Sequence, residues 1–344
     1  MSLRSGPIFV VGAMRSGSTL LRLCLDSHER IAIGPESGFM GAVAAMKSIP
    51  DWDAGPGWYR RYGLEDDEMN ARIRAFYADI FTRTAAARGK ARWGDKTPFH
   101  TWHVREMASI FPDAQLIGIV RHPAATLASM RRWHYSAAES VSKWVRANSE
   151  IVRQAAFLGR ERFAVCRYED LVLRPEPTLR ALLDFLDEPW SDRVLAHHEV
   201  QRGQAWTGVV EGGTHPTDAI DPSRVERWRD DLAVGELTLI SERVPSALLD
   251  VLGYDPRDPR PLPLSQILVP VEHADLSRLP NGKYATGSFD PDRRRLPNDP
   301  LELAHRLQKA ERALERATAR PSARVARALR RLRRSWCARH RSPR

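Results

Sequence analysis

Short apolar runs alternate along the first half of the chain with longer segments in which apolar residues recur at helical spacing. Strands that alternate with helices form parallel sheets covered on both faces, so this pattern predicts an α/β fold. The expected strands are 8–12, 31–33, 91–94, 115–120 and 162–167. The expected helices are 17–27, most of 38–88, 99–110, 123–133, 139–159 and 175–187.

A glycine-containing loop joins the first expected strand to the first expected helix. Gly12 and Gly17 have the G-x-x-x-x-G spacing of loops that hold phosphates, but Ser18 stands where nucleoside triphosphatases have a lysine. Backbone N–H groups and the positive end of a helix dipole meet at such a loop, and Arg15 adds a planar cationic donor. The loop therefore suits a phosphate-like group, but not a magnesium-bound triphosphate.

Further polar residues follow the other expected strands. Ligands of parallel α/β sheets collect at the carboxyl ends of the strands, so we expect these side chains to share one site with the loop. They are Glu36, Lys96, Arg121 and Tyr168.

The C-terminal part of the chain has a different composition. Residues 256–300 are rich in proline and are expected to form a linker or an irregular wrap. Residues 301–344 are expected to form a basic amphipathic helical tail, with ten arginines and no acid after position 319. Subtracting those ten from 53 basic residues leaves 43 against 43 acidic ones, so residues 1–319 are formally neutral.

This charge distribution limits the expected partners. The neutral globular part gives no reason to expect nucleic-acid binding, whereas the tail is suited to an anionic membrane surface or to pairing in a homodimer. A solvated tail without a partner is the alternative. The three cysteines are far apart and form no metal-type cluster, and no run of about 18 apolar residues occurs. These features predict a cytoplasmic protein without a metal.

Four segments, taken together, resemble one enzyme family. They are VVGAMRSGSTLLRLCLDSH with IGPES, GDKTPF, LIGIVRHPAATLASM, and RYEDLVLRPEPTLRALLDFL with WSDRVLAHHE. In this order they resemble sulfotransferases that use 3′-phosphoadenosine 5′-phosphosulfate (PAPS), most closely the tyrosylprotein sulfotransferase branch. The resemblance covers about residues 8–255. It implies a P-loop-like three-layer fold with a central parallel sheet, in a domain spanning 1–255.

The resemblance also implies roles for individual residues. Glu36 would be the general base that takes the acceptor's proton, and Lys96 with Arg15 would stabilise the transition state. Arg121 and Ser129 would hold the 3′-phosphate, and Tyr168 would contact the donor. A sulfuryl group bears less charge than a phosphoryl group, so no metal is implied. The 5′-phosphosulfate would lie in the loop formed by Arg15, Ser16, Gly17, Ser18 and Thr19.

The chain departs from the family pattern at two places. Trp133 occupies the position of an arginine, and Pro216 replaces a serine in the segment expected to cover the donor. Thr214 or Thr217 could replace that serine, and Arg224 could replace a missing lysine. The sequence does not identify the molecule that carries the acceptor hydroxyl, which could be a peptide tyrosine, a saccharide, a lipid or a phenolic natural product. Two alternative functions are a non-catalytic nucleotide-binding module that acts through its arginine-rich tail, and a P-loop kinase.

Overall fold

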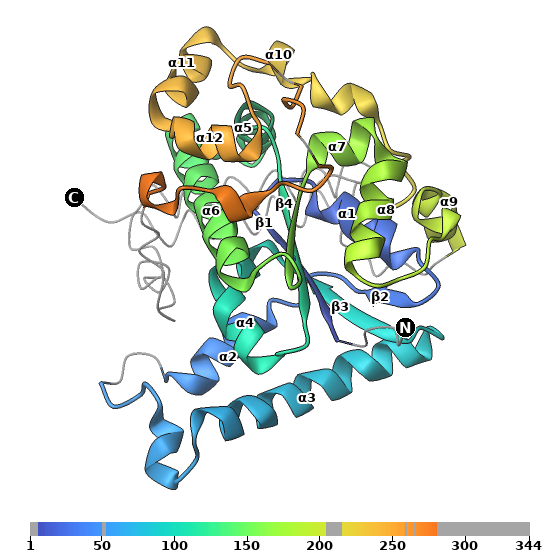
Figure 1. Cartoon of the computed structure of the whole chain (residues 1–344), viewed down its shortest axis with the longest axis vertical. Helices are drawn as coiled ribbons and strands as arrows, with labels where there is room; N and C mark the ends of the chain where they lie inside the picture. The colour runs from blue at the N-terminus through green and yellow to red at the C-terminus, as the bar shows by residue number, and fades with distance from the viewer. Residues whose placement is uncertain (1–5, 50–52, 204–214, 259, 265, 281–344) are drawn as a thin grey trace, which may run out of the picture. The chain divides into compact units, whose positions relative to one another are not determined.

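The computed structural model describes residues 6–49, 53–203, 215–258, 260–264 and 266–280 (Figure 1). The chain divides into two units, Met1–Gly287 and Ser288–Arg344, and all described residues belong to the first. The basic tail expected over 301–344 lies outside the described residues, so its helix and its partners stay predictions.

Five parallel strands form one sheet in the order β2-β3-β1-β4-β5. The central strand β1 places Phe9 opposite both Asp95 of β3 and Leu116 of β4. The strands are β1 (Ile8–Gly12), β2 (Ile31–Ile33), β3 (Arg92–Lys96), β4 (Gln115–Val120) and β5 (Phe163–Arg167). The predicted α/β fold with a central parallel sheet is therefore confirmed.

Helices cover both faces of the sheet. They are α1 (Ser18–Asp26), α2 (Phe39–Lys47), α3 (Asp66–Ala87), α4 (Val104–Ile110), α5 (Pro123–Arg131), α6 (Ala137–Leu158), α7 (Tyr168–Leu173), α8 (Pro175–Phe185), α9 (His197–Val200), α10 (Trp228–Asp231), α11 (Val234–Arg243) and α12 (Ser246–Leu252). None of the helices in the described part of the chain combines the length and apolarity needed to cross a membrane.

Alternate residues of β1 enter two different hydrophobic cores, as expected of a strand buried on both faces. Phe9 and Val11 pack in a core shared with α4 and α6, whereas Ile8 and Val10 pack in a core shared with α1 and α8. Figure 1 shows α4 and α6 on one side of the strands, and α1 and α8 on the other. The result is a three-layer arrangement.

Two of the differences between the observed and the predicted element boundaries have a clear physical cause. The helical stretch expected over 38–88 is interrupted between α2 and α3, where Gly57 adopts a left-handed conformation (φ 60°) before a 3-10 helix at Trp58–Tyr62. Strand β3 continues to Lys96, two residues beyond the expected end. Its last two residues, Asp95 and Lys96, are charged, so an apolar pattern could not reveal that they are buried strand residues.

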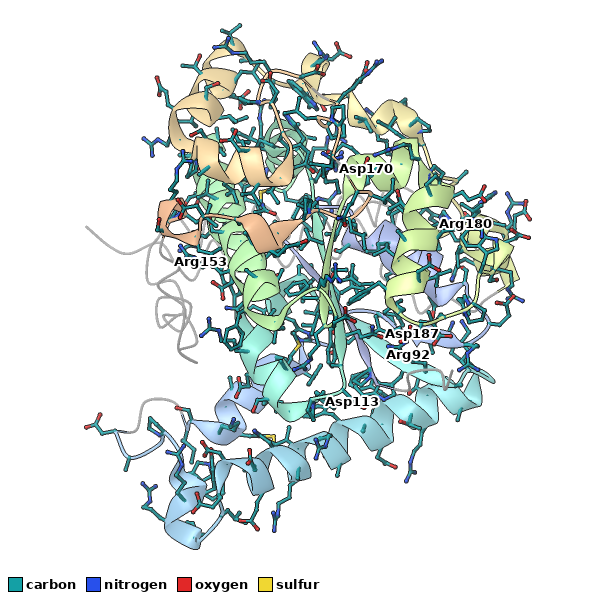
Figure 2. All side chains as sticks on the ribbon, in the orientation of Figure 1. Arg92, Asp113, Arg153, Asp170, Arg180 and Asp187 are labelled. Atoms are coloured by element: carbon teal, nitrogen blue, oxygen red, sulfur yellow. The ribbon has the colours of Figure 1, made fainter. Side chains whose placement is uncertain are left out.

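The amino-terminal end of the sheet is held by a buried arginine. Arg92, labelled in Figure 2 near the start of β3, is 1% exposed and donates to the carbonyls of Gly6 (2.7 Å) and Leu186 (2.6 Å) and to Gln115 Oε1 (2.6 Å). This arginine therefore has a structural role. The opposite, carboxyl end of the sheet carries the polar residues singled out by the sequence.

Part of the proline-rich segment predicted over 256–300 is described. Val269 N donates to Val165 O of β5 (2.8 Å), and Arg153 of α6 binds the carbonyls of Leu279 (2.6 Å) and Pro280 (2.8 Å). This segment therefore packs on the sheet and on α6. The domain boundaries at 255 and 300 stay predictions.

A buried polar cluster fixes the chain just after β4. His122 Nδ1 accepts from Ala124 N (3.2 Å) at the start of α5, so Nε2 carries the proton and donates to Asp255 O (2.7 Å). The His122 backbone N–H donates to Glu169 Oε1 (2.9 Å), and Tyr254 donates to the other oxygen of Glu169 (2.7 Å). Burial lowers the pKa of His122 to about 4 and raises that of Glu169.

His122 predicts a specific pH dependence of stability. Its pKa is lowered by folding from 6.5 to about 4. Between these pH values His122 is protonated in the unfolded chain but neutral in the folded one. The contribution of neutral His122 to the free energy of unfolding is therefore complete above pH 6.5 and is lost as the pH falls towards 4. We expect His122 to account for a loss of about 2 kcal/mol in unfolding free energy from about pH 7 to about pH 5.

Urea unfolding of wild type and His122→Asn at several pH values measures this contribution. Asparagine preserves the helix cap but does not titrate, so the variant should lose less stability on acidification. The exposed His215→Asn is the matched control and should keep the wild-type pH dependence. Equal slopes for wild type and His122→Asn would contradict the prediction.

Candidate functional site

The glycine-containing loop lies at the carboxyl end of the central strand. Ser16 N donates back to Ala13 O (3.2 Å), and Arg15 and Gly17 have positive φ values of 70° and 94°. Gly17 is the N-cap of α1, and no side chain in the described part of the chain caps this helix. The first N–H groups of α1 are therefore available to an anion at the loop.

Close packing explains why this loop has glycine at two positions. A Cβ atom at Gly17 would lie 2.2 Å from the ring of Tyr168, and one at Gly12 would lie 2.6 Å from Ser16 Oγ. Tyr168, which follows β5 and is 4% exposed, thus supports the loop backbone directly. Both glycines are required by close approach, and Gly17 also by its conformation.

An ion pair lies on the side of the loop that faces β2 and β3. Lys96 Nζ of β3 is 2.5 Å from Glu36 Oε1, and it is also 3.4 Å from Thr19 Oγ1 at the start of α1. The Lys96 side chain is completely buried, whereas that of Glu36 is 40% exposed. A carboxylate in this position is accessible to an acceptor hydroxyl while it remains oriented by a buried cation.

The segment that carries Glu36 is anchored by residues that follow β3. Gly38 N donates to Thr97 Oγ1 (3.3 Å), and Met40 N donates to His100 Nε2 (3.3 Å), so the residues after β3 hold the start of α2. A Cβ atom added at Gly34 or Gly38 would meet no atom within 4 Å. The chain around Glu36 is therefore open to solvent on its outer side.

Arginines gather on the other side of the loop, which faces β4 and β5. Arg15 Nε donates to Ser129 Oγ of α5 (2.9 Å), and Arg121 Nη1 donates to Arg15 O (3.3 Å). The Arg121 guanidinium lies over the Tyr168 ring, 4.2 Å from its centroid. Burial, followed by repulsion from Arg121 and Arg132, lowers the pKa of Arg15 to about 10.

All of the site residues expected from the sequence thus lie around the loop, but they form two groups. Glu36, Lys96 and Thr19 form one group, and Arg15, Ser129, Arg121 and Tyr168 form the other. Ser16, Gly17 and Ser18 lie between them. Ser16 Oγ is buried without a hydrogen-bond partner among the described residues. The side chain of Arg15 belongs to the second group, and its role in stabilising the transition state together with Lys96 stays a prediction.

Thr101 is a supporting residue that the sequence did not reveal. Its Oγ1 accepts from Gly12 N (3.0 Å) and donates to Gly12 O (3.1 Å), so it holds the start of the loop from the 3-10 helix Pro98–His103. No local pattern marks this threonine, because its partner lies 89 residues away.

The positions that depart from the family pattern have other contacts. Trp133 lies 5.4 Å from the Arg15 guanidinium, and Arg132 is bound to Asp231 (2.6 Å). Arg224 contacts Asp218 (3.3 Å), and its carbonyl accepts from Arg121 Nη2 (3.3 Å).

Thr217 and Thr214 are the two expected replacements for the missing serine. Thr217 Oγ1 pairs with His215 Nδ1 (2.7 Å), whereas Thr214 lies outside the described residues. Within the described ranges, no group of three or more His, Cys, Asp or Glu side chains is placed to hold a metal ion.

Comparisons with known proteins agree on one family. The model of the sulfotransferase family matches residues 7–192. The chain is 32% identical over 267 residues to protein-tyrosine sulfotransferase 1 of Danio rerio, covering 72% of each protein. It is 29% identical to protein-tyrosine sulfotransferase 2 of Gallus gallus, covering 72% of this chain and 69% of that protein.

A solved structure supports the fold. The sulfotransferase domain of the olefin synthase from Synechococcus PCC 7002 is 23% identical, with a TM-score of 0.51. The match covers 74% of this chain and 97% of that domain.

The cytoplasmic location expected from the sequence is wrong. The protein-tyrosine sulfotransferases that the chain matches are Golgi membrane enzymes, and this relationship overturns the expectation. The expectation rested on composition and on the lack of a long apolar run, and neither property reports a compartment.

The relatives also decide between the functions that the sequence left open. They favour an enzyme over a non-catalytic nucleotide-binding module, and sulfuryl transfer over the phosphoryl transfer of a kinase. The family model covers more than half of the 344 residues, and the order of strand, glycine loop and helix agrees with it. The chain is a sulfotransferase and belongs to the sulfotransferase family.

Proposed function

We propose that this sulfotransferase transfers a sulfuryl group from PAPS to the hydroxyl of a tyrosine side chain in a protein, with Glu36 as the general base. The observation that carries the proposal is the ion pair between Glu36 and the buried Lys96 (2.5 Å), next to the anion-binding loop. The acceptor class comes from the relatives, which are named as protein-tyrosine sulfotransferases.

The donor groups of the site suit a nucleotide with two separate anionic groups. The loop amides and the buried, unpartnered Ser16 hydroxyl would hold the 5′-phosphosulfate. Arg121, whose buried Nε has no partner among the described residues, would hold the 3′-phosphate with Ser129. Tyr168, beneath the loop and the Arg121 guanidinium, would keep both in place. When bound, PAPS supplies a sulfuryl group activated by its bond to a phosphate.

The two charged residues beside the loop have complementary tasks. Glu36 would take the proton from the acceptor hydroxyl as the acceptor oxygen bonds to sulfur. The bond between sulfur and the 5′-phosphate oxygen would break, with adenosine 3′,5′-bisphosphate as the leaving group. Lys96, a buried cation 3.4 Å from Thr19 Oγ1, would neutralise the charge that develops on that departing oxygen.

Incubating the protein with PAPS and a peptide that contains one tyrosine tests the proposal. Mass spectrometry should detect an added sulfo group on the tyrosine, and the same peptide with phenylalanine should remain unmodified. Modification of a serine-only peptide, or of saccharide and lipid acceptors in place of the tyrosine, would contradict the proposed acceptor. Turnover with magnesium-ATP but not with PAPS would contradict the proposed donor.

A further inference from the structure

The 3-10 helix that follows β3 contacts both parts of the candidate site. Thr101 of this helix binds Gly12 at the start of the glycine-containing loop through two hydrogen bonds (3.0 and 3.1 Å). His100, the residue before it, accepts a hydrogen bond from Met40 N at the start of α2 (3.3 Å). Neighbouring residues of one short helix therefore hold the loop and the segment that carries Glu36.

The first turn of α2 relies on a contact from outside the helix. The first N–H groups of a helix have no partner within it, and the side chain of the preceding residue usually accepts from one of them. In α2 that residue is Gly38, which has no side chain and a φ of 64°. His100 replaces the missing cap, because it accepts from the second N–H of the helix. Glu36 lies two residues before Gly38, so the position of its backbone depends on where α2 begins.

The surroundings of His100 fix its orientation and its tautomer. The side chain is buried, and the Phe39 ring packs edge-on against it with 4.9 Å between ring centroids. Because Nε2 accepts from Met40 N, the proton is on Nδ1. Nδ1 lies 3.0 Å from Oδ1 of Asp95, which is also buried, although the two groups are not aligned as a hydrogen bond. A carboxylate beside Nδ1 favours the proton there and leaves Nε2 as an acceptor.

Strand β3 ends in two charged residues that act on the same segment. Adjacent strand residues point to opposite faces of a sheet. Lys96 on one face pairs with Glu36 (2.5 Å), and Asp95 on the other face lies beside His100 (3.0 Å). Lys96 thus holds the carboxylate itself, whereas His100 holds the backbone four residues further along the chain.

We propose that His100 is a positioning residue for the reaction. By holding the start of α2, it keeps the Glu36 carboxylate directed at the acceptor hydroxyl. The inference rests on the proposed role of Glu36 as the general base. It divides two roles between neighbouring residues, since Thr101 supports nucleotide binding and His100 supports proton transfer. A misplacement of about 1 Å between reacting groups is enough to cost about 100-fold in rate.

Kinetics of two variants at position 100 test this role. The side chain in His100→Asn is too short to reach Met40 N. We expect its kcat with a tyrosine peptide to fall about 10- to 100-fold, while the affinity for adenosine 3′,5′-bisphosphate changes less than about twofold. In His100→Gln the longer side chain can place its oxygen where Nε2 lies, so this variant should recover most of the loss in kcat.

Two further variants of the same 3-10 helix are controls. Thr101→Val should weaken binding of adenosine 3′,5′-bisphosphate, because it loses the hydrogen bonds to the loop. His103→Gln, beside Glu106 (3.6 Å), should change neither nucleotide affinity nor kcat. The double variant Glu36→Gln, His100→Asn should be no slower than Glu36→Gln alone, because His100 acts through Glu36.

The melting temperature of each variant without ligand sets an assay temperature at which all of them are folded. A wild-type kcat in His100→Asn would overturn the assignment, as would a loss of nucleotide affinity equal to the loss in kcat. Equal losses in His100→Asn and His100→Gln, or a further loss in the double variant, would also contradict it. If Glu36→Gln itself retains the wild-type kcat, the proposed function fails first.

Discussion

Replacing Glu36 with glutamine is expected to lower kcat by about 10²- to 10⁴-fold, with little change in KM for the donor. Glutamine has nearly the same shape and can still accept a hydrogen bond from Lys96, but it cannot take a proton from the acceptor hydroxyl. The side chain is 40% exposed, so the substitution should leave the fold intact. Steady-state kinetics with PAPS and a tyrosine peptide, followed by mass spectrometry, measures the effect.

Glu176→Gln is a suitable control for this experiment. Glu176 is also paired with an arginine, Arg180 (2.8 Å), but it lies on the exposed surface of α8. Its substitution should leave kcat unchanged. A Glu36→Gln enzyme with wild-type kcat would assign the proton transfer to another group, whereas a large increase in donor KM would indicate a binding role for Glu36.

Replacing Lys96 with methionine is expected to lower kcat by about 10²- to 10³-fold, because a buried cation no longer stabilises the departing phosphate. Methionine approximates the volume of the lysine stem, and the Glu36 left without its partner can be hydrated because it is partly exposed. Kinetics under saturating donor isolates the effect on the chemical step. The affinity for adenosine 3′,5′-bisphosphate measures any effect on binding.

Lys47→Met provides the matched loss of a paired lysine. Lys47 is the last residue of α2, apart from the loop residues, and it is bound to Glu106 (3.3 Å). Replacing Lys47 should leave kcat near that of wild type. The double variant Glu36→Gln, Lys96→Met should lose less than the product of the two single losses, since the two residues act as one unit. Full additivity in the double variant would be evidence against a shared catalytic role.

Much of this candidate site could be predicted because most of its residues lie at the end of a strand or directly after one. The loop residues from Gly12 to Thr19 are contiguous, and the strand pattern alone places Glu36, Lys96 and Arg121 at the same sheet edge. The direction of the Arg15 side chain could not be predicted in this way. It depends on a backbone φ of 70° and on Ser129, which α5 brings to the loop from 114 residues away.

The supporting interactions were equally hidden from sequence patterns. Thr101 and His122 are buried polar residues whose partners come from distant segments, so neither follows a helical or strand periodicity. The cover expected over the donor stays a prediction. Its replacement residues depended on a family pattern that this chain does not follow at Pro216.

The absence of neighbours around Gly34 and Gly38 has a consequence for protein engineering. The glycine-containing loop has no spare room, because a single methyl group at Gly17 would collide with a tyrosine ring. The chain on either side of Glu36 has space for larger side chains, and Gly34 has no positive φ that would exclude them. A mutant library confined to position 34 could therefore diversify the acceptor preference proposed for the Glu36 side without altering the loop that is proposed to hold the nucleotide.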